Sequence, residues 1–289
     1  MKKSGKLPVY TALVFGVLLF TGLSTHVVAE SWKNAARDVE SFPFSEHYID
    51  SVMSYHGVER PVSPLRSIST PAFAASGERL VFQVSWGFVK GGYVVIETKP
   101  QPHNRTIRIG AKALSSNFVS AFFRIRNYVL STVDADGLYP IYFEQHTREG
   151  NYTADGYMLY EHGNQVIVEG RRSMVLDAPS YVHDYLSLIP RIRSMNFTKH
   201  DVFSHYVYMN REVSPMTFEV TDRENISVDA GSFNCLKIEP TLIGEGRTLS
   251  RRDRMEIWVT DDEHKMPVKL RTRVKFGSLT ARLIHYERF

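Results

Sequence analysis

Two stretches of the chain repeat one pattern, and this repeat constrains the fold more than any other feature. The first stretch runs from Leu130 to Phe143 and the second from Glu256 to Leu270. In each, an apolar run meets an aspartate and a polar turn follows. A proline, Pro140 or Pro267, then opens a run that alternates apolar and polar residues. Each stretch is therefore predicted to form a β-hairpin.

The turn residues give physical reasons for this prediction. Asp134 and Asp261 can accept hydrogen bonds from the backbone two residues on, and Gly137 can supply a residue with positive φ. Proline fits the first residue of a strand, because no ladder donor is required there. The alternative is that such hairpins recur independently in any β protein.

The strands after the prolines are predicted to have one buried and one solvated face, as in an antiparallel sheet covered on one side. The predicted buried face carries Ile141 and Phe143 in the first hairpin and Leu270 in the second. The predicted solvated face of the first hairpin carries Tyr142, Glu144, His146 and Arg148.

The rest of the chain predicts an antiparallel meander with one interruption. Leu80 to Phe88, Tyr93 to Thr98 and Arg105 to Ala113 have the composition and alternation of strands. Between Ala178 and Ser194 apolar residues recur at helical spacing, and Pro190 is expected to kink or end that helix. We therefore expect a mainly β fold: a large curved antiparallel sheet, as a half-barrel or open barrel, with one crossing helix.

The N-terminal 29 residues have the form of a secretory signal peptide. Lys2, Lys3 and Lys6 precede an apolar run from Val9 to Leu23, and Val27 to Ala29 offers a small-residue cleavage site. An uncleaved N-terminal anchor is the alternative, since the run is long for a signal but short of the ~20 residues of a spanning helix. The signal predicts a periplasmic protein, with the periphery of the outer membrane as a second location.

Three regions follow from these patterns. Residues 1–29 are the predicted signal peptide, and residues 30–76 a helical arm followed by a linker rich in proline and serine. Residues 77–289 are predicted to form a single β-rich domain. No second segment has the length and hydropathy of a membrane span.

Net charge and cysteine content bear on two questions: whether the protein binds nucleic acid and whether it contains a disulfide bond. The net charge is +4, and the three lysines of the predicted signal leave +1 for the exported chain. The alkaline pI of about 9.0 is therefore no argument for a nucleic-acid partner, and we expect none. Cys235 is the single cysteine, so no internal disulfide can form; its apolar neighbours predict a buried side chain.

Several short phrases occur along the chain in a characteristic order. They are Gly77 to Gly87, Phe123 to Arg126, Ser131 to Asp134, His183 to Ser187 with Arg193, Ala230 to Phe233, and Ile257 to Val259. In this order they resemble the family catalogued as domain of unknown function 3108, over roughly residues 77–289. The resemblance implies a bacterial, exported, β-rich protein and no settled activity.

The second hairpin carries another, shorter resemblance. The segment from Trp258 to Leu270 is similar to repeats of periplasmic lipoprotein carriers of the LolA, LolB and RseB type. This likeness implies a half-barrel sheet that holds acyl chains. The chain departs from such carriers because it has one evident crossing helix rather than the several that plug them.

Motifs of enzymes and metal sites are largely missing from the sequence. It contains no Gly-x-Ser-x-Gly, His-Glu-x-x-His, Gly-rich phosphate loop or Cys-x-x-Cys. Asp134 and Asp136 begin like a calcium loop, but Leu138 and Gln145 stand where oxygen ligands belong. We therefore expect that the protein is not an enzyme and that it has no catalytic residues, no cofactor and no metal site.

A hydrolase using His183, Asp184 and Ser187 is the remote alternative. Sequence neighbours point to different sides of a helix, so His183 and Asp184 do not easily both serve Ser187. We expect Asp184 to lie on the helix surface, paired with Arg191 or Arg193.

The expected function is the binding of an apolar ligand in the cell envelope: an acyl chain, a lipid or a lipidated partner. Aromatic residues make up 12% of the chain and fall at inward strand positions. The predicted binding residues are Phe82, Trp86, Phe88, Phe143 and Phe276 on the sheet, with Tyr185 and Leu188 on the crossing helix as a lid.

Two further hypotheses concern partners. A basic cluster of Arg247, Arg251, Arg252 and Arg254 is a candidate for docking lipid phosphates at a membrane periphery or an acidic partner, with a solvated loop as the alternative. The rival function is a structural or adaptor module. Such a module would bind another envelope protein by its sheet edge or by residues 58–76.

Overall fold

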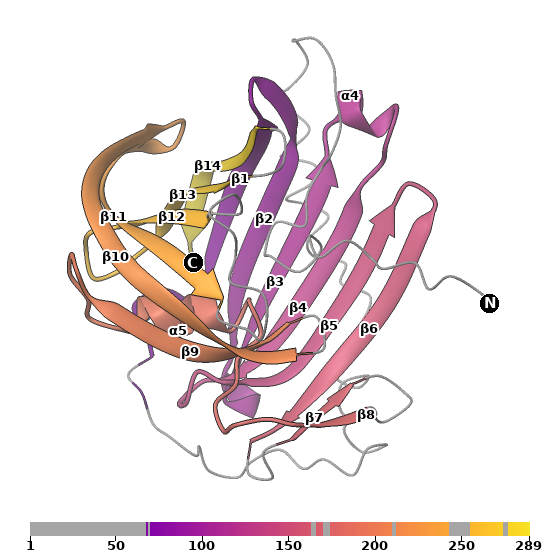
Figure 1. Cartoon of the computed structure of the whole chain (residues 1–289), viewed down its shortest axis with the longest axis vertical. Helices are drawn as coiled ribbons and strands as arrows, with labels where there is room; N and C mark the ends of the chain where they lie inside the picture. The colour runs from indigo at the N-terminus through magenta and orange to yellow at the C-terminus, as the bar shows by residue number, and fades with distance from the viewer. Residues whose placement is uncertain are drawn as a thin grey trace.

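A computed structural model describes residue 68 and residues 70–162, 166–169, 174–209, 212–242, 255–273 and 277–289. The predicted signal peptide and the predicted helices of residues 30–57 lie outside these residues. The described chain forms one antiparallel sheet of fourteen strands with short helices (Figure 1). The prediction of a mainly β, antiparallel fold is therefore confirmed.

The strands follow the chain from β1 to β14. Their bounds are β1 Glu78–Trp86, β2 Val89–Gln101, β3 Thr106–Ser115, β4 Arg126–Asp134, β5 Pro140–Glu149, β6 Tyr152–Glu161, β7 Val166–Glu169, β8 Met174–Asp177, β9 Val202–Met209, β10 Glu212–Val228, β11 Gly231–Leu242, β12 Met255–Thr260, β13 Pro267–Arg273 and β14 Ser278–Arg288. The helices are α3 Ala72–Ser76, η3 Pro102–Asn104, α4 Asn117–Ser120 and α5 Leu188–Arg193. None of these helices has the length and hydropathy needed to cross a membrane.

The strand order shows that the sheet is open, with β8 and β9 at its two edges. The order is β8-β7-β6-β5-β4-β3-β2-β1-β14-β13-β12-β11-β10-β9, so strands adjacent in sequence pair, and β1 pairs with β14. The first strand lies at the middle of the sheet; the path then reaches one edge at β8, crosses to the other edge at β9, and returns to the middle. Figure 1 shows the sheet curling so that the segment carrying α5 lies within its curve.

Both predicted hairpins are present. The first is β4 and β5, and the second is β12 and β13; Pro140 and Pro267 are the first residues of their second strands. Each turn is closed by the same kind of backbone bond, from the N–H of Asp134 to the oxygen of Tyr139 (2.9 Å) and from that of Thr260 to Met266 (2.8 Å). The two stretches are therefore equivalent in structure as well as in pattern.

Two details of the turns differ from prediction. The residues with positive φ are Leu138 (54°) and Lys265 (46°), each two positions before its proline, and not Gly137. In the first turn the Asp134 carboxylate accepts from the N–H of Asp136, two residues on as expected, and also from that of Gly137. In the second turn the accepting carboxylate is that of Asp262 and not that of Asp261. The second turn is one residue longer than the first, and its accepting carboxylate, that of Asp262, lies within the turn rather than at the end of the preceding strand.

The crossing helix is much shorter than predicted. Only Leu188–Arg193 is helical, and the preceding residues form turns with Tyr181 at φ 62°. The Asp184 carboxylate accepts from the N–H groups of Leu186 and Ser187, a local bond that competes with helix formation. Pro190 does not end the helix, which continues to Arg193. It is the third helical residue, where an N–H has no intrahelical partner to lose.

The expectation of one solvated face is wrong for the first half of β5. Tyr142 and Glu144, on the predicted wet face, are buried, and Leu159 beside them on β6 is fully buried. The Tyr142 hydroxyl donates to Glu144 (2.8 Å), and burial raises the pKa of Glu144 to about 7. Both faces are therefore buried in the first half of β5, whereas Arg148, near the end of the strand, is exposed as predicted.

The residues just before the sheet pack into it. Helix α3 falls in the predicted linker, but Phe73 and Ala74 are buried in the main core with Leu80 and Phe82. Cys235 is fully buried, which confirms the prediction for that side chain. The described end of the linker is thus part of the folded domain.

Candidate functional site

An apolar cavity lies between the concave face of the sheet and the crossing segment. Its volume is about 120 Å³. Its walls are Phe82 and Ile96; Tyr185, Leu188, Ile189, Ile192 and Arg193; Val207, Met209, Met216 and Phe218; Ile238, Pro240, Met255, Ile257 and Val259; and Lys265, Pro267 and Leu270. Nearly all are hydrophobic, so the cavity fits an apolar group.

Strand alternation explains why this wall is apolar. Val220 pairs with Ile238, Ile238 with Ile257, and Ile257 with Leu270, so these four side chains stand in one row on one face. Helix α5 faces the row with Leu188, whose neighbours Ile189 and Ile192 also line the cavity.

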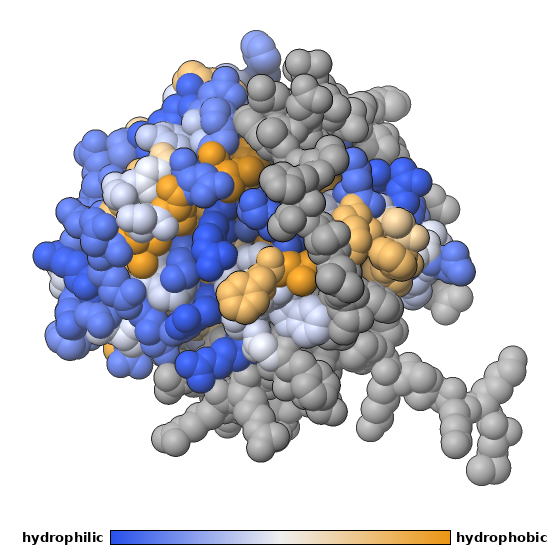
Figure 2. Space-filling view, turned by 90° about the horizontal axis from the view of Figure 1, so that it is seen from above, coloured by the Kyte–Doolittle hydropathy of each residue, from blue (hydrophilic) through white to orange (hydrophobic). Residues whose placement is uncertain are grey.

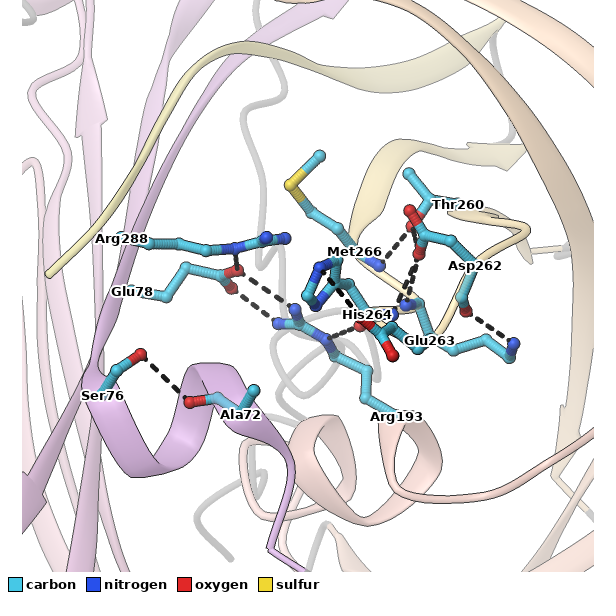
Figure 3. Close-up of polar contacts among 11 residues, drawn as sticks. Ala72, Ser76, Glu78, Arg193, Thr260, Asp262, Glu263, His264, Met266 and Arg288 are labelled. Carbon is cyan, nitrogen blue, oxygen red and sulfur yellow. Dashed lines mark hydrogen bonds and ion pairs between the residues drawn. The ribbon is translucent and has the colours of Figure 1, made fainter.

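Arg193 fixes the helix that covers the cavity. Its guanidinium donates to both oxygens of Glu78 (2.6 and 3.1 Å) and to the backbone oxygen of His264 (2.8 Å), as Figure 3 shows. It also lies 3.3 Å from the ring centre of Phe73. Burial lowers the pKa of Arg193, and the Glu78 carboxylate opposes that shift. Arg193 therefore joins α5 to β1, to α3 and to the β12–β13 turn.

The second cation at the cavity is also engaged. Lys265 donates to the backbone oxygen of Asp262 (2.8 Å), and its ammonium lies 5.1 Å from the ring centre of Phe197. The charged groups of Arg193 and Lys265 are thus both bonded within the protein, and the surface that faces a ligand is mainly apolar.

His183, Asp184 and Ser187 lie together, but not as a nucleophile with its base. The Ser187 hydroxyl donates to the backbone oxygen of Asp184 (3.0 Å), so His183 Nδ1, at 3.1 Å, acts as donor to that hydroxyl. The Asp184 carboxylate accepts from Ser131 and not from His183. Ser187 is 0% exposed. This arrangement gives Ser187 neither a base nor access to substrate.

The pairing expected for Asp184 is wrong. Its partner is Ser131 of β4 (2.7 Å), whereas Arg193 pairs with Glu78. Burial raises the pKa of Asp184 to about 6, and burial holds the pKa of His183 well below its usual value. The cluster ties the crossing segment to the sheet. A parallel bridge between His183 and Val207 ties the same segment to edge strand β9.

The structure brings only some of the predicted binding residues to the cavity. Phe82, Tyr185 and Leu188 line it. Phe143 is buried beside it, with its ring edge-on to Tyr185 at 5.2 Å. Trp86 lies near the end of β1 against Gly277.

Phe88 was wrongly predicted to face inward, because it is fully exposed in the β1–β2 turn. The alternation of β1 ends at Trp86, so the pattern was extended two residues too far. Phe276 and the cluster Arg247, Arg251, Arg252 and Arg254 lie outside the described residues.

Sequence reasoning missed the aliphatic part of the wall. Met216, Ile238 and Ile257 belong to strands that alternate clearly, and the shared face was readable from that alternation. Ile189 and Ile192 were included in the helical pattern but were not assigned to the site. Among the described residues, no group of three or more His, Cys, Asp and Glu is placed to hold a metal ion.

The fold and the cavity define the class: an open, curved antiparallel β protein with an apolar interior site beneath a crossing segment. The chain belongs to the DUF3108 family, whose model, described as a protein of unknown function, matches residues 81–284. No curated protein matches the sequence.

Three solved structures match the chain at low sequence identity, and one of them has a TM-score above 0.5. A β-barrel-like protein of domain of unknown function DUF1849 from Brucella abortus is 11% identical with a TM-score of 0.54, over 76% of this chain and 100% of that one. A candidate lipoprotein from Parabacteroides distasonis is 10% identical with a TM-score of 0.32, over 77% and 99%. A candidate exported protein with a YmcC-like fold from Bacteroides fragilis is 10% identical with a TM-score of 0.29, over 76% and 99%.

Proposed function

We propose that this protein is an exported, non-enzymatic binding protein of the cell envelope that holds an apolar ligand, an acyl chain, in the cavity beneath α5. The observation that carries the proposal is the cavity itself. It has a volume of about 120 Å³ and is walled by aliphatic and aromatic side chains of the sheet and α5. Cavities of roughly 150 Å³ with such walls bind benzene.

The size of the cavity limits what can bind without movement. A group of four to six carbon atoms gains about 3–5 kcal/mol on burial, which association costs of about 4 kcal/mol or more offset. A longer chain needs α5 to move outward. Both ends of α5 are anchored, by Arg193 to Glu78 at its C-terminal end and by Asp184 to Ser131 just before Leu188, so such a movement has a cost and affinity is expected to be micromolar or weaker.

Titration with a fluorescent fatty-acid probe tests the proposal. The wild type should bind saturably. Ile192→Trp, which fills the cavity, should weaken binding at least about tenfold with the urea midpoint retained. Val202→Trp is the matched control, because Val202 is exposed on β9 and its replacement fills nothing. Leu188→Asp, which places a charge in the apolar wall, should also abolish binding.

The absence of saturable binding up to the solubility limit of the probe, together with no lipid in extracts of the purified protein, would overturn the acyl-binding function. One observation favours an adaptor in that event. Val202 and Tyr206 of edge strand β9 are 62% and 48% exposed, and the crossing segment bridges this edge at Val207. A partner strand could then pair with the first half of β9.

Export is tested separately by N-terminal sequencing of the protein from the periplasmic fraction. The basic start, the apolar run and the small residues at Val27 to Ala29 support cleavage before Glu30. Recovery of an intact Met1 in the membrane fraction would instead show an anchor.

A further inference from the structure

Three connections of the sheet lie at its upper end in Figure 1: the β1–β2 turn, the α4 segment between β3 and β4, and the β5–β6 turn. Backbone hydrogen bonds join them. The N–H of Ser116 donates to Gly91 beside the first turn (2.8 Å), and that of Gly150 in the third donates to Arg124 of the α4 segment (2.8 Å). The connections therefore form one continuous rim.

Each connection exposes an aromatic side chain. Phe88 is fully exposed, Phe122 is 72% exposed and Tyr152 is 45% exposed. Figure 2 looks down on this end and shows hydrophobic residues in orange among hydrophilic ones in blue. These side chains add apolar surface to one end of the domain, and exposed apolar surface that is rimmed by polar residues is a feature of interaction sites.

The exposed positions are built into the local backbone. Phe88 follows Gly87, which has φ 55°, and the N–H of Gly87 donates to Ser278 of β14 (3.3 Å). Phe122 closes a turn in which its N–H donates to Val119 (3.0 Å). Both rings therefore sit on fixed turns.

The charged groups of this rim are mainly basic. Lys90, Arg124 and Arg126 are exposed and lie within four residues of Phe88 or Phe122 in the sequence. Two acids lie near the β5–β6 turn in sequence: Glu149 is half-buried and accepts from the side chain of Asn127 (2.6 Å), and the exposed Asp155 is paired with Arg148 and His146. The rim is thus both aromatic and positively charged.

We propose that this aromatic–basic rim (Phe88, Lys90, Phe122, Arg124, Arg126 and Tyr152) docks on the surface of an anionic lipid bilayer. The rings enter the interface between headgroups and acyl chains, and the cations contact lipid phosphates. Charge complementarity selects an anionic membrane as the occupant. The proposal stands apart from the acyl-binding cavity, whose walls contain none of these residues.

Co-sedimentation with vesicles tests the rim. The protein is purified as it accumulates in cells, so that all variants share one N terminus. Wild type should bind vesicles of phosphatidylethanolamine and phosphatidylglycerol more tightly than vesicles of phosphatidylcholine, and salt at about 0.5 M should weaken the difference. Phe88→Ser and Phe122→Ser should each reduce binding about tenfold. Lys90→Glu should reduce it at least about fivefold, on anionic vesicles only.

Tyr206→Ser is the matched control, since Tyr206 is an exposed aromatic residue on β9, away from the rim. It should leave vesicle binding unchanged, and the rim variants should keep wild-type binding of the fatty-acid probe. Binding that is equal on neutral and anionic vesicles, or that survives the double variant Phe88→Ser with Phe122→Ser, overturns the proposal. A wild-type protein that binds anionic vesicles but does not bind the fatty-acid probe would contradict the proposed acyl-binding function and leave the proposal for the rim standing.

Discussion

Arg193 and Glu78 lie 115 residues apart in sequence and form a two-point ion pair inside the protein, with N–O distances of 2.6 and 3.1 Å. Their side chains are 3% and 1% exposed. The pair joins the last residue of α5 to the first residue of β1. It therefore holds the cover of the cavity against the middle of the sheet.

Removing one partner of this pair should be costly. Arg193→Met leaves the Glu78 carboxylate buried, and Arg288, at 3.4 Å, is its one remaining cationic partner among the residues that the structure describes. Stability should therefore fall by about 3–5 kcal/mol in urea unfolding. Lys199→Met is the control. It breaks the exposed pair with Asp222, which solvent screens, and should leave the urea midpoint almost unchanged. Equal losses of stability for the two substitutions would show that the buried ion pair stabilises the fold no more than the exposed pair does.

Asp184 should give stability a defined pH dependence. Burial raises its pKa from 3.8 to about 6, so the folded protein binds this proton more tightly than the unfolded chain does. The contribution of Asp184 is therefore full below about pH 4 and is lost as the pH rises through about 6. The stability of the wild type relative to Asp184→Asn should fall by up to about 3 kcal/mol between about pH 4 and 7.

This difference isolates Asp184, because the Asp184→Asn variant keeps an acceptor for the N–H groups of Leu186 and Ser187 but has no titrating group at this position. His162 and His183, whose pKa values are lowered by burial, act in the opposite direction and cancel in the comparison. Urea midpoints measured across the pH series provide the test. A difference that stays constant with pH contradicts the raised pKa.

Ser187→Ala should reduce stability without affecting ligand binding. The substitution leaves His183 Nδ1 without its hydroxyl partner in a buried site, which should cost about 1–3 kcal/mol. Affinity for the fatty-acid probe should match the wild type at temperatures where the variant is folded. A folded Ser187→Ala protein that loses function in a deletion-complementation assay would revive the hydrolase hypothesis.

Phe82→Ala should separate the cavity wall from the exposed rim. Phe82 is fully buried and lines the cavity, so its truncation should destabilise the fold by about 3–5 kcal/mol. The enlarged cavity should admit bulkier probes than the wild type does. Phe88→Ala, at an exposed turn, should change the free energy of unfolding by less than about 0.5 kcal/mol. Similar losses for both residues would place Phe88 in the core, against the structure.

The antiparallel strands and both hairpins could be predicted from the sequence. The reason is that these features are encoded within a few residues: Asp134 accepts from Gly137, and the first strand residue after each turn is a proline. Alternation likewise placed Phe82 on the inner face, where it lines the cavity.

Tertiary structure alone decided the cover of the site. The helix predicted over residues 178–194 shrinks to Leu188–Arg193, because Asp184 bonds to its own backbone and to Ser131, 53 residues away. Arg193 takes Glu78 as its partner rather than the carboxylate nearby in sequence. Local sequence patterns do not predict contacts between residues so far apart in the chain. A buried charged group or hydroxyl needs a hydrogen-bond partner, and only the folded structure decides which residue provides it.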